Sequence, residues 1–328
     1  MNNSQPIIRV KVDPSNPGQF FACCGLLELA DRLWGDCCGR FDDGTAFEII
    51  GLPEGSSLLN LLETLTDVGL QGALTPDLAQ ERATLESKKR QFKRENKQLS
   101  DSEEKRRDYL GKLLRSGSML IPAPFNLLLD WWQLDSDEVP KTWAGPMEVR
   151  RIANAALVEC HTAFRQSDPF DYPCVLRPFD GDSDSVDQQT DESSKVEPFY
   201  FDSVRGSNAA PIDIGFSPNK LAMPRIMPTG GNRKAKMKQV KMETAAFPAT
   251  EFFALIGLQR FRPVPTKRAR IFEYTVWTIA LPPSVAAAAA CGLLYSEDGR
   301  RYEFENAFRT DQRKHKGFRP ATFIGDTQ

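Results

Sequence analysis

Residues 12–35 read VDPSNPGQFFACCGLLELADRLWG, and this stretch predicts how the chain begins to fold. Its apolar side chains recur at helical spacing toward its end, so we expect a helix over residues 19–34. Residues 13–17, in front of it, are rich in turn formers. We therefore expect Asn16 and Gly18 to shape the turn into the helix rather than to contact a ligand.

The same patterns extend outward along the chain. We expect short strands at residues 7–12, 46–50 and 271–280, and helices at residues 57–68, 145–164, 246–258 and 283–294. Residues 80–115 differ, because they carry many charges and few apolar side chains. Such a composition predicts an exposed helix or helical hairpin projecting from the body. The expected fold class is α+β: a mixed body of short strands and helices with a projecting charged helical insertion at about 80–116 and no clear C-terminal helical bundle.

The length of 328 residues exceeds what one growing core normally reaches, so we expect closely packed lobes. An N-terminal α+β lobe with the charged insertion is predicted at 1–167, and a basic β-rich lobe with an Ala-rich helix at 198–328. Between them, residues 168–197 form an acidic loop with too few apolar side chains to order itself.

The sequence favours a protein kept in the cytoplasm and outside the membrane. Its start lacks the basic and apolar regions of a secretory signal. Seven cysteines, an odd number that includes two neighbouring pairs, make a poor disulfide framework. The uncharged stretch 274–296 is long enough to cross a bilayer, but Pro282 and Pro283 divide it into a strand-like half and a helical half.

Catalysis has little support in the sequence, and we expect neither an enzyme nor a cofactor. There are two histidines, His161 and His315, and neither lies in a catalytic spacing. The motifs of nucleophilic hydrolases, P-loop NTPases and HExxH metalloproteases do not occur. The pairs Cys23–Cys24 and Cys37–Cys38 have the wrong spacing for a zinc site, so we interpret them as buried thiols and expect no metal.

The net charge of −2 hides a strong asymmetry. Residues 205–270 contain thirteen Lys and Arg against three acids, whereas residues 168–197 contain nine acids against two bases. A concentrated block of this kind presents a strong local field even in a mildly acidic protein. It is compatible with a solvated surface, but it favours a polyanionic partner.

Basic clusters within this distribution are candidates for contacts to a phosphate backbone. The predicted backbone contacts are Arg233, Lys234, Lys236, Lys238 and Lys241 in the segment GGNRKAKMKQVKM, together with Lys88, Lys89, Arg90, Lys93 and Arg94 in the charged insertion. In the insertion, residues 90, 93, 94 and 97 would share one helix face. The alternative interpretation of the insertion is a solvated helix with no partner.

Three phrases resemble one known family. They are VDPSNPGQFFACCGLLELADRLWG, FDSVRGSNAAPIDIGFSP and YTVWTIALPPSVAAAAACG, and they are similar to the large subunit of type I-G (formerly I-U) CRISPR Cascade interference complexes. The resemblance implies a non-catalytic, DNA-binding subunit of an RNA-guided surveillance complex. Such a subunit recognises the protospacer-adjacent motif on double-stranded target DNA and assists duplex opening and R-loop formation, while base pairing reads the sequence.

The resemblance also implies partners and a reading site. Expected partners are double-stranded target DNA, the 5′ handle of the CRISPR RNA, the backbone subunits of Cascade and a recruited helicase-nuclease. The residues expected to read the motif are Arg205, Ser207, Asn208, Asn219 and Lys220, which lie in Gly- and Asn-rich phrases. An ordinary turn explains the same residue types equally well.

Two alternative functions stay open at this point. One is a metal-independent CRISPR RNA-processing endonuclease or RNA-handle-binding component, with His161 or His315 as general base. The other is a scaffold whose basic surface contacts the acidic faces of other subunits.

Overall fold

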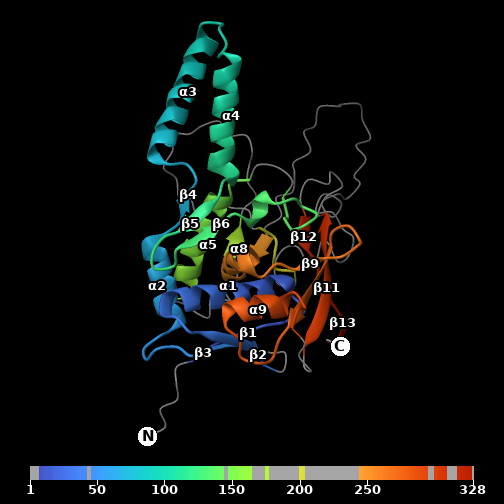
Figure 1. The fold of residues 1–328 in the computed structure, drawn as a ribbon. Coiled ribbons are helices and arrows are strands. Elements are labelled where there is room, and N and C mark those ends of the chain that lie inside the picture. The colour runs from blue at the N-terminus through green and yellow to red at the C-terminus, as the bar shows by residue number, and fades with distance from the viewer. Residues whose placement is uncertain are drawn as a thin grey trace, which may run out of the picture.

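The structure is a computed structural model that describes residues 7–42, 46–143, 147–164, 174–176, 199–203, 244–294, 299–308 and 316–326. Figure 1 shows a body of helices and small sheets from which two helices project. Every strand pair in these residues is antiparallel. The α+β class predicted from the sequence is confirmed.

Helix α1 (Pro17–Trp34) is the central element of the body. Its first residue is a proline, which is well tolerated there because a backbone N–H at the first position of a helix has no partner within the helix. The Asn16 side chain caps the helix, because its Oδ1 accepts hydrogen bonds from the backbone N–H of Gly18 (3.1 Å) and Gln19 (3.4 Å). All residues from 17 to 30 are buried, so α1 is enclosed on every side.

Helix α8 (Pro248–Arg260) crosses α1 at two glycines. A Cβ atom on Gly25 would lie 2.0 Å from the carbonyl oxygen of Phe253, and one on Gly257 would lie 2.0 Å from that of Phe21. The two backbones therefore touch, and only glycine permits the crossing. At the end of the same interface the buried Glu28 carboxylate pairs with Arg32 (2.6 Å) and Arg260 (2.5 Å).

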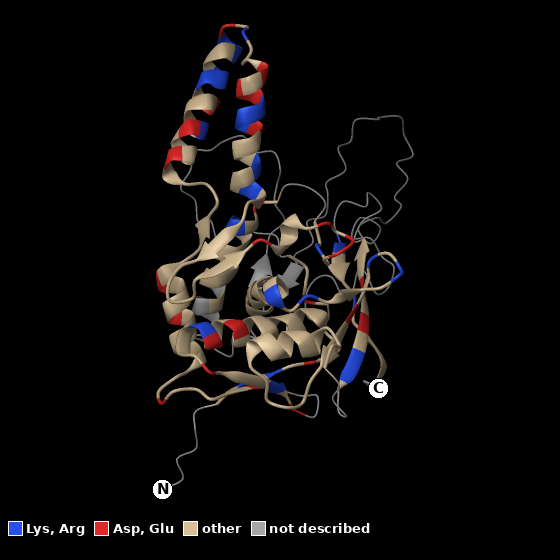
Figure 2. Cartoon of the chain, viewed as in Figure 1, with Lys and Arg blue, Asp and Glu red and all other residues tan. Residues whose placement is uncertain are grey.

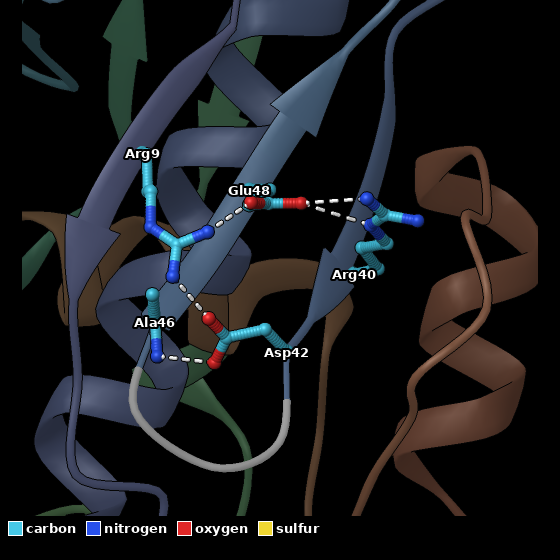
Figure 3. Close-up of polar contacts among 5 residues, drawn as sticks. All are labelled: Arg9, Arg40, Asp42, Ala46 and Glu48. Atoms are coloured by element: carbon cyan, nitrogen blue, oxygen red, sulfur yellow. Dashed lines mark hydrogen bonds and ion pairs between the residues drawn. The ribbon is translucent and has the colours of Figure 1, made fainter.

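The N-terminal sheet has the order β1-β3-β2. Its strands are β1 (Ile8–Lys11), β2 (Cys38–Phe41) and β3 (Ala46–Ile50). The register places Glu48 between Arg9 and Arg40, and Figure 3 shows its carboxylate accepting from both guanidiniums. Arg9 also pairs with Asp42, whose other oxygen accepts from the backbone N–H of Ala46 (2.7 Å). The charges on this face of the sheet are thus largely neutralised by one another.

The C-terminal sheet packs its aromatic face on α1. Its strands are β9 (Val264–Pro265), β10 (Ile271–Val276), β11 (Arg300–Phe308), β12 (Lys316–Phe318) and β13 (Thr322–Asp326). The ring of Tyr274 stacks on Phe20 with centroids 4.3 Å apart, and the Tyr274 hydroxyl donates to the carbonyl oxygen of Pro14. Phe304 and Phe318 of the same sheet pack edge-to-face against Phe21.

The remaining elements complete the body and the projection. They are α2 (Leu58–Val68), β4 (Gln71–Gly72), α3 (Pro76–Arg94), α4 (Asp101–Ser116), β5 (Met119–Ile121), β6 (Leu127–Leu129), the 3-10 helix η1 (Trp131–Gln133), α5 (Val149–Phe164), β7 (Cys174–Leu176), β8 (Thr244–Ala246) and α9 (Pro283–Ala290). The predicted hairpin exists as α3 and α4. Side chains from both predicted lobes, 1–167 and 198–328, belong to one hydrophobic cluster.

The ambiguous stretch at residues 274–296 is divided as its two prolines predict. β10 ends at Val276, and the chain then leaves the sheet to pair Leu281 with Gly39 of β2. α9 begins at Pro283 and is shorter than predicted, because it ends before Gly292, which has a left-handed φ of 70°. Among the helices of the described ranges, none is both long and apolar enough to cross a bilayer.

Candidate nucleic-acid interface on the projecting hairpin

Local signals at both ends form the two helices of the hairpin. α3 begins with the Thr75 cap and Pro76 at its first position, and it ends before Asn96, which has a left-handed φ of 53°. α4 begins with a capping box between Ser100 and Glu103, in which each side chain accepts from the other residue's backbone N–H. These caps hold the helices although α3 has no buried residue and α4 buries only Leu110 and Gly111.

The hairpin is fixed to the body at its base. Gly72 of β4 pairs directly with Met119 of β5, so the two strands that enter and leave the hairpin lie side by side. The indole N–H of the buried Trp132 donates to the carbonyl oxygen of Ser116 at the end of α4 (3.0 Å). Figure 1 shows the far end of the hairpin well away from the body. The geometry is that of an arm with a fixed base.

Ion pairs across the hairpin occupy part of its positive charge. Lys88 pairs with Glu103, and Lys89 pairs with Glu104 at 2.8 Å. Hydrogen bonds from Arg106 (2.7 Å) lower the pKa of Glu81, and the hydrogen bond from Lys88 lowers that of Glu103. The sequence predicts that both lysines contact a nucleic-acid backbone, and the structure places each against a carboxylate of α4.

Three other predicted contacts are exposed and lack such partners. Arg90, Lys93 and Arg94 lie in the last turns of α3, toward its far end, and within the described residues none of them forms an ion pair. Their spacing of three and four residues places Arg90 on one helix face with the other two. Figure 2 shows charges of both signs along the two helices. The arm is thus mixed in charge along its length and has unpaired cations near its tip.

The prediction that Lys97 shares this face is wrong. α3 ends at Arg94, and Lys97 lies beyond the helix, where it pairs with Glu95 (2.9 Å). The left-handed backbone at Asn96 turns the chain toward α4 and breaks the helical spacing.

The other sequence-predicted contacts lie outside the described residues. These are the motif-reading residues Arg205, Ser207, Asn208, Asn219 and Lys220, and the backbone-contacting residues Arg233, Lys234, Lys236, Lys238 and Lys241. The acidic segment 180–197 and His315 also lie outside them. His161 is on α5, but its side chain is not described.

A buried polar cluster anchors the chain just before residue 204. The amide of Asn16 donates to Asp202 (2.9 Å) and its oxygen accepts from the backbone N–H of Ser203 (3.2 Å). The buried Glu251 carboxylate accepts from the backbone N–H groups of Phe201 (3.0 Å) and Asp202 (3.1 Å). A Cβ on Gly18 would lie 2.3 Å from the carbonyl oxygen of Phe201. The start of α1 therefore positions the entry to the segment in which the reading site is predicted.

No local sequence pattern indicates this cluster. Asn16 caps α1 and so shapes the turn as expected, whereas Gly18 lies inside the first turn of the helix. The residues 201–203 that both contact are more than half the chain away in sequence. Glu251 carried no signal at all, because an acid in the first turn of a helix is usually exposed and interacts with the helix dipole.

The cysteines of the described residues are thiols with no metal-binding arrangement. Cys23, Cys24 and Cys37 are buried, and burial raises the pKa of Cys37 to about 12. Within the described part of the chain, no three or more His, Cys, Asp or Glu side chains are placed to hold a metal ion. The interpretation of the two cysteine pairs as buried structural thiols agrees with these positions, with Cys38 only partly covered.

Comparisons with models of protein families, with curated proteins and with solved structures found no match to this chain.

Proposed function

We propose that this chain is a non-catalytic nucleic-acid-binding subunit of an RNA-guided surveillance complex. The observation that supports it best is the arm, which is fixed at its base and carries Arg90, Lys93 and Arg94 exposed toward its tip. Exposed cations at helical spacing can follow successive phosphates, and they bind through charge without reading bases. The arm accordingly positions nucleic acid, and motif recognition belongs to another part of the chain.

The sequence resemblance to the type I-G CRISPR large subunit supports a more specific role. On this proposal the partner of the arm is double-stranded target DNA, and the chain assists motif recognition and duplex opening within Cascade. Base-edge contacts are assigned to Arg205, Ser207, Asn208, Asn219 and Lys220. The buried cluster of Asn16 and Glu251 supports this division, because it gives the chain a rigid starting point at residues 201–203.

The test is a salt titration of duplex-DNA binding by the complex assembled with a double variant, Lys93→Gln with Arg94→Gln. A matched control, Lys11→Gln with Arg150→Gln, removes the same charge from exposed positions on β1 and α5. Because each phosphate contact contributes about 0.9 to the slope of log K against log salt, the arm variant should flatten the slope by up to about 2. The control should leave the slope nearly unchanged.

The loss of affinity in the arm variant should also be independent of the DNA sequence. The arm variant should weaken binding to matched and altered motifs alike, whereas Asn208→Ala or Asn219→Ala should cost about 1–3 kcal/mol on the preferred motif only. Equal slopes for the arm variant and the control would remove the arm from the interface.

A further inference from the structure

A second group of cations lies near the base of the arm and is separate from its tip. Lys316 opens β12, and its backbone N–H donates to the carbonyl oxygen of Thr142 at 2.7 Å. The side-chain amide of Asn306 on β11 donates to the carbonyl oxygen of Lys141 at 3.1 Å. These two hydrogen bonds hold the loop that follows η1 against the sheet, and they bring Lys141 and Lys316 together although 174 residues separate them.

Among the residues that the structure describes, the lysines in this group lack the partners that burial normally requires. Lys316 is only 6% exposed, and within the described residues its ammonium has no ion pair or hydrogen bond. Lys141 is partly buried, and within the described residues the only hydrogen bond of its ammonium is a long one of 3.3 Å to the carbonyl oxygen of Trp132. Burial of a charge is costly unless an opposite charge accompanies it.

The charges that face the two lysines increase this imbalance. Burial first, and then the neighbouring cations Lys141 and Arg270, lower the pKa of Lys316. Burial and Lys112 of α4 lower the pKa of Lys141. Asp135 raises the pKa of Lys141, and Asp137 raises that of Lys316. Both acids are exposed, however, and neither forms an ion pair with these lysines within the described residues.

Arg270 belongs to the same group and is itself weakly paired. Its guanidinium lies 4.7 Å from the ring centre of Phe308, which is paired with Lys316 in the β11–β12 register. The guanidinium nitrogen nearest to the Glu305 carboxylate is 3.8 Å from it. Lys141 and Arg270 therefore both lie near the buried Lys316, and the carboxylates around the three cations are exposed or, in Glu305, only loosely paired. A small anion with several acceptor oxygens would satisfy all three donors at once.

We propose that Lys141, Lys316 and Arg270 form a binding site for a phosphate group. The phosphate can belong to a polynucleotide backbone or to a free phosphate or nucleotide, since the chemistry that the three cations recognise is the same. The proposal does not depend on the function assigned to the arm, because it uses different residues on different elements.

The first test measures the melting temperature of the full-length chain at constant ionic strength, with inorganic phosphate replacing chloride. The wild-type melting temperature should rise with phosphate, as it does for any ligand that binds only the folded state. Lys316→Met should raise the melting temperature in chloride, because it removes an unpaired buried charge, and it should abolish the response to phosphate. The control Lys11→Met, at an exposed site, should keep the response.

The second test separates the two sources of phosphate. A short single-stranded oligonucleotide is titrated against wild type and Lys141→Met, with the arm variant Lys93→Gln/Arg94→Gln in parallel. The site is assigned to a polynucleotide if Lys141→Met loses affinity for the oligonucleotide while the wild type still binds it in the presence of inorganic phosphate. It is assigned to a free phosphate if Lys141→Met binds the oligonucleotide as the wild type does, while the wild-type melting temperature still responds to phosphate. A Lys316→Met chain that melts lower in chloride, or a wild type that responds to neither ligand, would overturn the proposal.

Discussion

Among single residues, Glu251 is notable as an acid buried in the core. Its side chain is buried beside Asp202, and burial raises its pKa to about 8 although two backbone N–H groups donate to it. An unfolded glutamate has a pKa of about 4.3. Between these values the folded chain holds a proton that the unfolded chain has lost.

This difference predicts a pH-dependent stability with a definite sign. The free energy of unfolding should fall as the pH rises from about 4.5 to about 8, by at most about 1.4 kcal/mol per pH unit from this group, and then level off. Glu251→Gln retains the shape of the protonated acid and should remove this part of the dependence. Urea unfolding at several pH values measures both chains. Parallel pH profiles for the two would show that Glu251 is ionised in the fold.

At the element scale, the crossing of α1 and α8 depends on two glycines. Gly25→Ala places a methyl group 2.0 Å from a carbonyl oxygen of α8, so the helices must separate and the core must repack. We expect a loss of about 3 kcal/mol in the free energy of unfolding. Gly257→Ala should cost a similar amount, because it meets the facing carbonyl of Phe21.

A third glycine provides the control for this prediction. Gly111 lies inside α4, and a Cβ there would meet only the side chain of Arg115, at 3.4 Å. Gly111→Ala should therefore stabilise the chain by about 0.5–1 kcal/mol through a less flexible unfolded state. Denaturant unfolding of the three variants compares the sites. Similar changes at Gly25 and Gly111 would contradict the close crossing.

The hairpin should be the least protected of the long helices. α3 has no buried residue, and it contacts α4 through partly exposed ion pairs such as Lys89–Glu104 and Arg106–Glu81. Such pairs contribute little and are screened by salt. Hydrogen exchange followed by mass spectrometry should show α3 amides exchanging through local opening, faster in high salt, while α1 amides exchange only through global unfolding. Equal protection of α1 and α3 would mean that the arm is part of the cooperative core.

At the scale of the whole molecule, one core joins the two ends of the chain. The rings of Phe20 and Phe21 from the N-terminal region pack on Tyr274, Phe304 and Phe318 from the C-terminal region. α1 is covered by α8 and by the C-terminal sheet, so neither region can bury its apolar surface alone.

Separate expression of residues 1–167 and 198–328 tests this arrangement. Each fragment alone should lack the cooperative thermal transition of the full chain, because the aromatic side chains of α1 would be left exposed. Proteolytic cleavage of the intact protein within residues 177–198 should instead leave two fragments that migrate together on size exclusion. A cooperative melt for the 1–167 fragment alone would show that it has a core of its own.

Local sequence signals are enough to predict several elements of this fold. The apolar spacing of residues 19–34 predicts the body of α1, although the helix begins two residues earlier, at Pro17. The prolines at 282 and 283 predict the division between β10 and α9, and the charge pattern of 80–115 predicts a projecting hairpin. Each signal acts over a few residues, through backbone geometry, caps or side-chain spacing. The helical spacing of the basic residues at 88–94 likewise predicts a candidate interface.

The packing of the whole chain settles which of these residues have partners. It paired Lys88 and Lys89 with α4 and left Arg90, Lys93 and Arg94 exposed, and it placed Lys97 beyond the helix. It also buried Glu251 beneath residues 201–202 and brought Lys141 to Lys316. Sequence periodicity gives the face on which a side chain lies but not what meets that face, because contacts between distant segments depend on how the whole chain packs.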